Sequence, residues 1–160
     1  MSGRAQPALH DRAAVAELLG REPGGAFEVV VRGQDGAPSV IANSPLLDDG
    51  TPMPTRYWLV DAALKAAVSR LEAAGGVRRA EGAVDPQALA AAHARYATDR
   101  ERAMPAGYRG PRPSGGVGGT REGVKCLHAH FAYWLAGGDD PVGDWVALEL
   151  GLVGPAGAGR

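Results

Sequence analysis

The sequence predicts an α+β fold in which a small antiparallel sheet of about three strands carries four to five helices on one side. Two short runs rich in β-branched residues flank the turn sequence QDGAP, a pattern typical of a β-hairpin. Longer segments with apolar residues at helical spacing begin at Asp or Asp-Pro and end at Gly. The chain has 24 Gly and 12 Pro among its 160 residues, so we expect long loops and few strands.

The expected strands lie in the first half of the chain. Residues 27–31 and 40–42 should form the hairpin, and residues 56–60, RYWLV, should add a third strand after a proline-rich extended segment. A length of 160 residues fits one domain, with a core of about residues 14–153, a loose N-terminus and the tail PAGAGR.

The expected helices share a cap residue or a glycine stop, and they cover residues 11–19, 61–74, 85–104 and 124–136 and a short segment after Asp140. The third of them is the longest, with Asp85 as its N-cap and Pro86 at its first helical position. Between it and the next helix, residues 104–123 should form a loop.

Composition excludes several classes of protein. A net charge of −1 argues against general nucleic-acid binding, and no run of residues is apolar enough for a membrane span or a signal peptide. The single cysteine, Cys126, excludes an intramolecular disulfide and a four-cysteine zinc cluster. We therefore expect a soluble cytoplasmic protein that binds neither nucleic acid nor membrane. Whether it binds another protein is left open.

The segment around the long loop predicts a pocket for a small anion, such as a phosphate ester or nucleotide. On the long helix, Leu89 is followed on one face by an imidazole, a phenol and a guanidinium, at His93, Tyr96 and Arg100. Backbone amides of a glycine-rich loop before the next helix, together with nearby basic residues, favour phosphate or carboxylate. The expected ligand-binding residues of this second wall are Gly115, Gly116, Gly118, Gly119, Thr120, Arg121 and Lys125. A solvated basic face and a flexible loop without a ligand are the alternatives.

His128 is the candidate catalytic residue of this pocket. At 100° per residue it falls in the middle of the apolar arc formed by Val124, Leu127, Phe131, Trp134 and Leu135. It should therefore be buried or point into a pocket, and converge with His93, Arg100 and the glycine loop, where it could act as general acid or base in a hydrolysis. The alternative is a buried histidine satisfied by one hydrogen bond.

A metal site is a further alternative, with Cys126 and His130 one helical turn apart and His93 as a third ligand. A small, half-buried apolar side chain is the other interpretation of Cys126, and we do not expect this thiol to be a catalytic nucleophile. The loop of Asp48, Asp49, Gly50 and Thr51 could bind a cation, supply a base or form a plain turn, and its role is left open.

Three stretches together, DGTPMPTRYWL, HARYATDRE and GGVGGTREGVKCLHAHFAYWLAGGDDPVG, resemble a bacterial family known as domain of unknown function 501, typical of actinobacteria. The resemblance extends from about Ala14 to Val153. It implies a cytoplasmic bacterial protein, often encoded near cell-division and exopolyphosphatase-type genes, and it assigns no activity or catalytic residue. A regulatory module linked to cell division or phosphate metabolism is therefore an alternative to the anion-binding enzyme.

Overall fold

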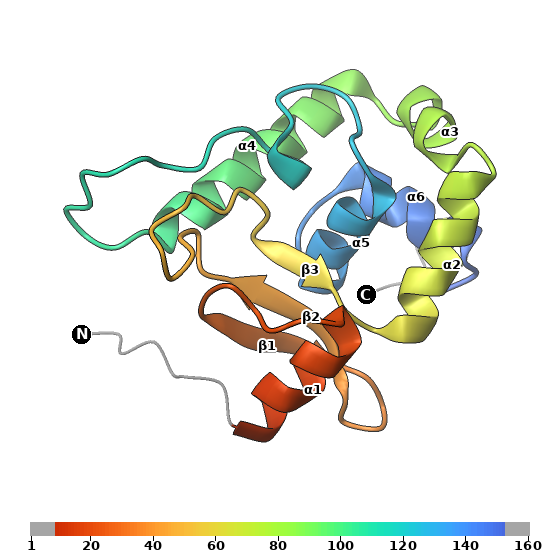
Figure 1. The fold of residues 1–160 in the computed structure, drawn as a ribbon. Helices are drawn as coiled ribbons and strands as arrows, with labels where there is room; N and C mark the ends of the chain where they lie inside the picture. The colour runs from red at the N-terminus through yellow and green to blue at the C-terminus, as the bar shows by residue number, and fades with distance from the viewer. Residues whose placement is uncertain (1–8, 153–160) are drawn as a thin grey trace.

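The computed structural model describes residues 9–152, so the expected loose N-terminus and C-terminal tail lie outside the described residues. Within these residues three strands and six α-helices follow one another with a single 3-10 turn, and Figure 1 shows their arrangement. In chain order the elements are α1 (Leu9–Leu19), β1 (Phe27–Arg32), β2 (Pro38–Asn43), β3 (Tyr57–Leu59), α2 (Ala62–Ala73), α3 (Gly76–Ala83), α4 (Pro86–Arg102), η1 (Val117–Gly119), α5 (Leu127–Leu135) and α6 (Pro141–Glu149).

The sheet has the order β1-β2-β3 and is antiparallel throughout. In the hairpin Phe27 pairs with Asn43, and on the other side of β2 Val40 pairs with Leu59. The predicted α+β class and three-stranded antiparallel sheet are confirmed. β2 is buried along its whole length because it lies in the middle of the sheet.

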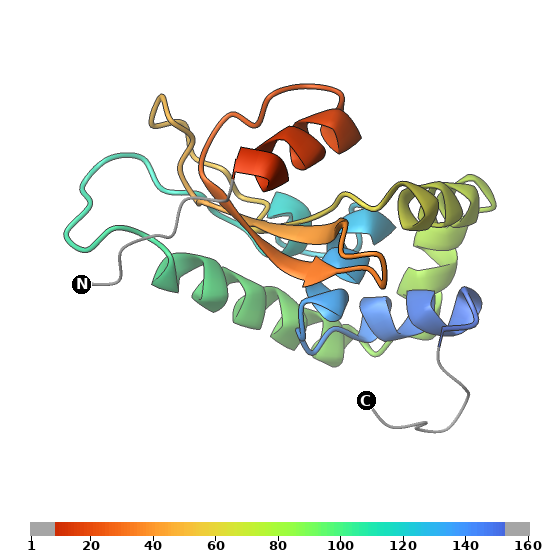
Figure 2. The same ribbon diagram turned by 90° about the horizontal axis from the view of Figure 1, so that it is seen from below.

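Helices cover both faces of the sheet, so the expectation of helices on one side is wrong. Figure 2 shows α1 on one face and α4, α5 and α6 on the other. Phe27, Ile41 and Val60 pack with Val15 of α1 on the first face, while Val40 and residues of the other helices form a second, larger core. The central strand β2 carries apolar side chains on both faces of the sheet, so helices must pack on each face to bury them.

Aspartate caps begin three helices, as the sequence predicts. The side chains of Asp61, Asp85 and Asp140 accept hydrogen bonds from backbone amides in the first turns of α2, α4 and α6. The glycine pair after α2 ends that helix, but Gly75, at φ +82°, also turns the chain directly into α3, which the sequence did not predict. The described part of the chain therefore has six α-helices where four to five were expected.

The helix expected from Val124 begins three residues later, at Leu127. Cys126 is the N-cap and is extended, with φ −151° and ψ 150°. Its side chain caps no amide; instead Oε2 of Glu72, from α2, accepts a hydrogen bond from the Leu127 amide at 2.8 Å. A carboxylate from another helix thus satisfies one of the free amides at the start of α5 and joins α2 to α5.

The polar stripe of α4 binds backbone groups of two loops. His93 is buried, and its Nδ1 accepts a hydrogen bond from the Val117 amide at 3.0 Å while its Nε2 lies 2.9 Å from the Gly123 carbonyl oxygen. Because an amide can only donate and a carbonyl can only accept, the imidazole is neutral with its proton on Nε2. One histidine therefore holds the start of η1 and the segment that follows η1.

Tyr96 and Arg100 hold the segment before β3 in the same way. The Tyr96 hydroxyl accepts hydrogen bonds from the backbone amides of residues 56 and 57, at 2.5 and 3.2 Å. The Arg100 guanidinium donates to the carbonyl oxygens of Pro54 at 2.9 Å and Gly115 at 2.8 Å. Arg100 is only 4% exposed, and its burial lowers the pKa of the guanidinium.

Gly116 is required where the loop crosses α4. A Cβ atom at this position would lie 2.3 Å from Nδ1 of His93 and 2.5 Å from its Cβ. Gly116→Ala should therefore displace the loop and lower the free energy of unfolding by about 1–3 kcal/mol. Urea unfolding checks this, with Gly82→Ala in α3 as the control, because a Cβ there meets no atom within 4 Å. Equal stability of the two variants would contradict the close contact with His93.

Because the Tyr96 hydroxyl is buried, we expect the free energy of unfolding to fall at alkaline pH. Burial raises the pKa of Tyr96 to about 12, whereas an unfolded tyrosine ionises near about pH 10. The folded state keeps the proton, so this stabilisation is complete below about pH 10 and declines by about 1.4 kcal/mol per pH unit up to about pH 12. Tyr96→Phe should cost about 1–3 kcal/mol at pH 8, because two amides lose their acceptor, and should make the alkaline decline shallower. Urea unfolding at pH 8, 10 and 11 measures both effects; an unchanged decline would refute the assignment to Tyr96.

Candidate functional site

A pocket of about 400 Å³ opens between the first turn of α5, the strand β3, the C-terminal end of α1 and the N-terminal part of α2. We call it the cationic pocket. Its lining residues come from separate parts of the chain and are Leu19, Arg21, Thr55, Tyr57, Trp58, Leu59, Lys65, Gly118, Lys125, Cys126, His128 and Ala129. The loops that α4 holds supply Thr55 and Gly118, so the α4 hydrogen bonds shape this wall of the pocket.

Three cationic side chains line the pocket, and no carboxylate is among the lining residues. Arg21 follows α1 and lies over the Trp58 ring, with its guanidinium carbon 5.4 Å from the ring centroid. Lys65 comes from α2, and Lys125 donates to the Gly118 carbonyl oxygen at 3.3 Å. The pocket therefore combines three cationic side chains with the aromatic ring of Trp58.

His128 lies at the edge of the cationic pocket and is paired with a carboxylate of α2. Its Nδ1 is 3.0 Å from Oε1 of Glu72, and the side chains of both residues are about a quarter exposed, at 28% and 24%. Its Nε2 lies 3.1 Å from the Ser69 hydroxyl and 3.4 Å from the Lys65 carbonyl oxygen. Both ring nitrogens are thus engaged by α2.

Cys126 lies beside this pair. One ligand atom from each of Glu72, Cys126 and His128 lies within 4.8 Å of the other two. Burial raises the pKa of the Cys126 thiol, and the negative charge of Glu72 adds to this effect. Both effects disfavour the thiolate that a nucleophile requires.

The structure separates His128 from His93 and Arg100. His93 and Arg100 do meet the glycine loop, but as supports of its backbone, while His128 contacts residues 65–72 of α2. The predicted convergence of His128 with His93 and Arg100 is therefore wrong. The physical reason is that α5 is buried on most sides, while His128, in its first turn, faces Glu72 and Ser69 of α2 rather than α4.

His130, rather than His128, is the buried histidine of α5. It is 1% exposed, and its Nδ1 lies 2.6 Å from Oδ2 of Asp140, which is fully buried. The other carboxylate oxygen of Asp140 accepts the amide of Val142, so this aspartate also caps α6. Nε2 of His130 has no hydrogen-bond partner among the described residues.

The predicted metal ligands Cys126, His130 and His93 do not form one site. His93 uses both nitrogens on backbone groups, and His130 is paired with Asp140. Among the described residues, Cys126 instead clusters with the Glu72 and His128 side chains.

The glycine loop uses its amides within the fold. The amide of Gly116 donates to the Thr120 carbonyl oxygen, that of Val117 to His93, and that of Gly119 to the Gly116 carbonyl oxygen. These amides are not available to an anion, and the Thr120 hydroxyl donates to the Glu122 carbonyl oxygen rather than capping α5. Of the predicted ligand-binding residues, only Gly118 and Lys125 line the cationic pocket.

Two other predicted positions lie outside the pocket. Arg121 is exposed and lines a different hollow together with the carboxylates of Glu81 and Glu122. Asp48 and Asp49 lie in an exposed turn, where the side chain of Asp49 accepts a hydrogen bond from the Thr51 amide at 2.9 Å. The Thr51 side chain, and after it the Thr51 amide, lowers the pKa of Asp49 by hydrogen bonding to its carboxylate, and the contacts fit the turn interpretation of this loop.

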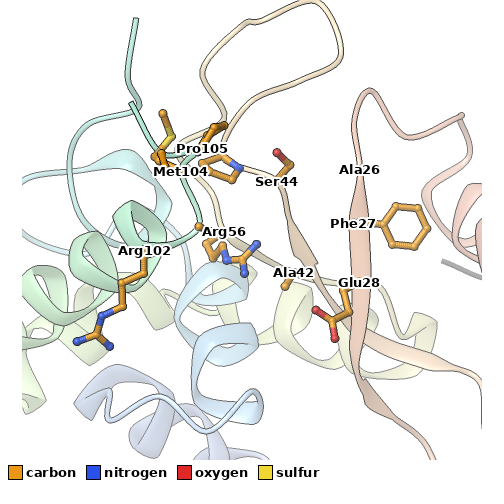
Figure 3. Close-up of a pocket in the computed structure, with 12 residues that line it drawn as sticks. Ala26, Phe27, Glu28, Ala42, Ser44, Arg56, Arg102, Met104 and Pro105 are labelled. Atoms are coloured by element: carbon orange, nitrogen blue, oxygen red, sulfur yellow. The ribbon is translucent and has the colours of Figure 1, made fainter. Parts of the chain in front are cut away.

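A larger pocket of about 490 Å³ lies between β1 and the end of α4. Figure 3 shows the Arg56 guanidinium in its middle, while the Arg102 side chain extends away from it. Arg56 already donates to the Asn43 carbonyl oxygen, and the carboxylate of Glu28 lines the same pocket. Its charge is therefore mixed, unlike that of the cationic pocket.

Sequence reasoning missed Arg21, Lys65 and Glu72. Lys65, Ser69 and Glu72 are spaced i, i+4 and i+7, so they form a polar stripe on α2 just as His93 and its neighbours do on α4. That spacing was the available indication for the two α2 residues, but only the fold shows that this stripe faces α5.

Comparison with known proteins adds a family but no activity. Over the described residues, no helix combines the length and the apolar character that crossing a bilayer requires. No curated protein and no solved structure matches the chain. The profile of a family described as protein of unknown function (DUF501) matches residues 29–148, which include β2, β3, α2 to α5 and most of the cationic pocket. The chain therefore belongs to the DUF501 family.

Proposed function

We propose that the chain binds a small phosphate-bearing molecule in the cationic pocket. The observation that carries this proposal is the set of three cationic side chains, Arg21, Lys65 and Lys125, in a pocket whose lining contains no carboxylate. At the start of α5, beside the pocket, the Glu72 carboxylate already accepts a hydrogen bond from the Leu127 amide and offsets part of the positive charge. Three cationic side chains exceed this one neighbouring carboxylate, so an anion that binds between them reduces the repulsion between like charges.

The size of the pocket and its aromatic ring favour a phosphate ester with an organic part. A volume of about 400 Å³ lies within the usual range of small-molecule sites. Trp58 offers aromatic surface to a flat group such as a base, while the cations bind the phosphate. A nucleotide-like ligand would use both features.

The proposal assigns binding and not proton transfer by His128. Both nitrogens of this imidazole are engaged by α2, so neither is free to exchange a proton with a ligand in this arrangement. Binding without turnover, as in a regulatory module, and hydrolysis of the bound ester both remain compatible with the pocket. The free thiol of Cys126 is typical of a reducing compartment, which favours the cytoplasm.

Isothermal titration with inorganic phosphate, pyrophosphate and nucleoside monophosphates tests the proposal. We expect saturable binding that weakens with added salt, because the contacts are charged and partly exposed. Lys65→Ala and Lys125→Ala should each weaken binding about fivefold, corresponding to about 1 kcal/mol. Arg121→Ala is the matched control, since Arg121 is basic but lies in the other hollow.

Absence of saturable binding for every one of these ligands would overturn the proposal. Equal weakening by Arg121→Ala would also overturn it, since the effect would then come from overall charge rather than from the pocket. Hydrolysis is checked separately, by release of inorganic phosphate from the nucleotides that bind.

A further inference from the structure

We propose that Glu72, Cys126 and His128 bind one divalent transition-metal ion of the zinc class at the edge of the cationic pocket. The three side chains come from two elements, α2 and the start of α5, and present one donor atom each within 4.8 Å of the others. Metal binding at this cluster does not depend on the proposed function; only the link to phosphate below rests on it.

The donor set selects the class of metal. One sulfur, one imidazole nitrogen and one carboxylate oxygen suit zinc and its neighbours, whereas magnesium and calcium prefer oxygen ligands alone. Donor atoms around a tetrahedral zinc ion lie about 3.3–3.8 Å apart, as bond lengths of about 2.0–2.3 Å require. The distance of 3.0 Å between Nδ1 of His128 and Oε1 of Glu72 is already close to this value.

The surroundings orient two of the three ligands. Oε2 of Glu72 is fixed by the Leu127 amide at 2.8 Å, which leaves Oε1 to face His128. Nε2 of His128 lies near the Ser69 hydroxyl and the Lys65 carbonyl oxygen, and a metal-bound histidine usually donates its second N–H to such an acceptor. When Nδ1 of His128 binds the metal, the imidazole proton is on Nε2 and can be donated to the Ser69 hydroxyl or the Lys65 carbonyl oxygen. The Cys126 thiol releases its proton to solvent when its sulfur binds the metal.

Three protein ligands leave a position for a fourth. Cys126 and His128 both line the cationic pocket, so the open position faces the space in which we place the phosphate. If the proposed function holds, a phosphate oxygen fills that position, and the metal and the phosphate each strengthen the binding of the other.

Titration of the purified chain with Co²⁺, and competition of Co²⁺ by Zn²⁺, tests the site in the absence of phosphate. We expect one equivalent to bind and to produce a thiolate-to-cobalt charge-transfer band. Cys126→Ser should abolish this band while retaining the fold, because serine is a favourable N-cap. Glu72→Gln and His128→Ala should each weaken binding at least tenfold, and Zn²⁺ should protect Cys126 from alkylation in the wild type.

His10→Ala is the matched control, since this side chain is 81% exposed and lies on α1, away from the cluster. The affinity of His10→Ala for Co²⁺ should equal that of the wild type. Absence of binding by folded protein, or equal binding by wild type and Cys126→Ser, would overturn the metal site and leave the Glu72–His128 contact as a link between helices.

The two proposals fail separately. Lys65→Ala and Lys125→Ala should keep the cobalt spectrum, because neither side chain belongs to the metal site, even where phosphate binding is lost. Zn²⁺ should tighten the binding of inorganic phosphate in the wild type and not in His128→Ala. Metal binding without any phosphate binding would support the metal site and overturn the proposed function. Phosphate binding by a chain that binds no metal would support the proposed function and overturn the metal site.

Discussion

The hydrogen bonds from α4 to the backbone of two loops are the constraint on which the pocket depends. His93, Tyr96 and Arg100 contact no other side chain through these bonds; they bind amides and carbonyls of residues 54–57 and of the segment 115–123. Backbone groups in irregular segments need partners when they are buried, and one helix supplies them to both loops. The two segments, which supply Thr55 and Gly118 to the pocket, are therefore positioned together.

This use of α4 determines where a ligand can bind. A side chain that already fills its donors and acceptors with backbone groups has little left to offer a ligand, and burial of Arg100 keeps its charge from solvent. The charge available to an anion comes instead from Lys65 of α2, from Arg21 after α1 and from Lys125 before α5. The α4 side chains support the loops, and under the proposed function recognition belongs to other parts of the chain, so residues that look functional in the sequence have structural roles here.

Elements that are determined by neighbouring residues could be predicted from the sequence. The hairpin turn, the aspartate caps at Asp61 and Asp85 and the proline start of α4 all follow from neighbouring residues, and they are found where expected. The site was harder, because its residues are brought together by long-range contacts. Helical spacing identified the α4 stripe, but it did not show that the stripe meets backbone, and it gave no reason to connect Glu72 with Cys126, 54 positions later in the chain.

The start of α5 shows how a small local difference changes a functional interpretation. Spacing alone extended this helix back to Val124, whereas Cys126 is extended and the Leu127 amide is bound by Glu72 of another helix. His128, in the first turn of α5, faces Glu72 of α2, while His130, two residues later, is buried against Asp140. The carboxylate that caps α5 is also the one that faces His128 and Cys126, so any ion held there would join α2 to α5 as well as face the pocket. Binding at such a junction stabilises the folded chain by mass action, and the fold and the ligand site therefore depend on the same contact.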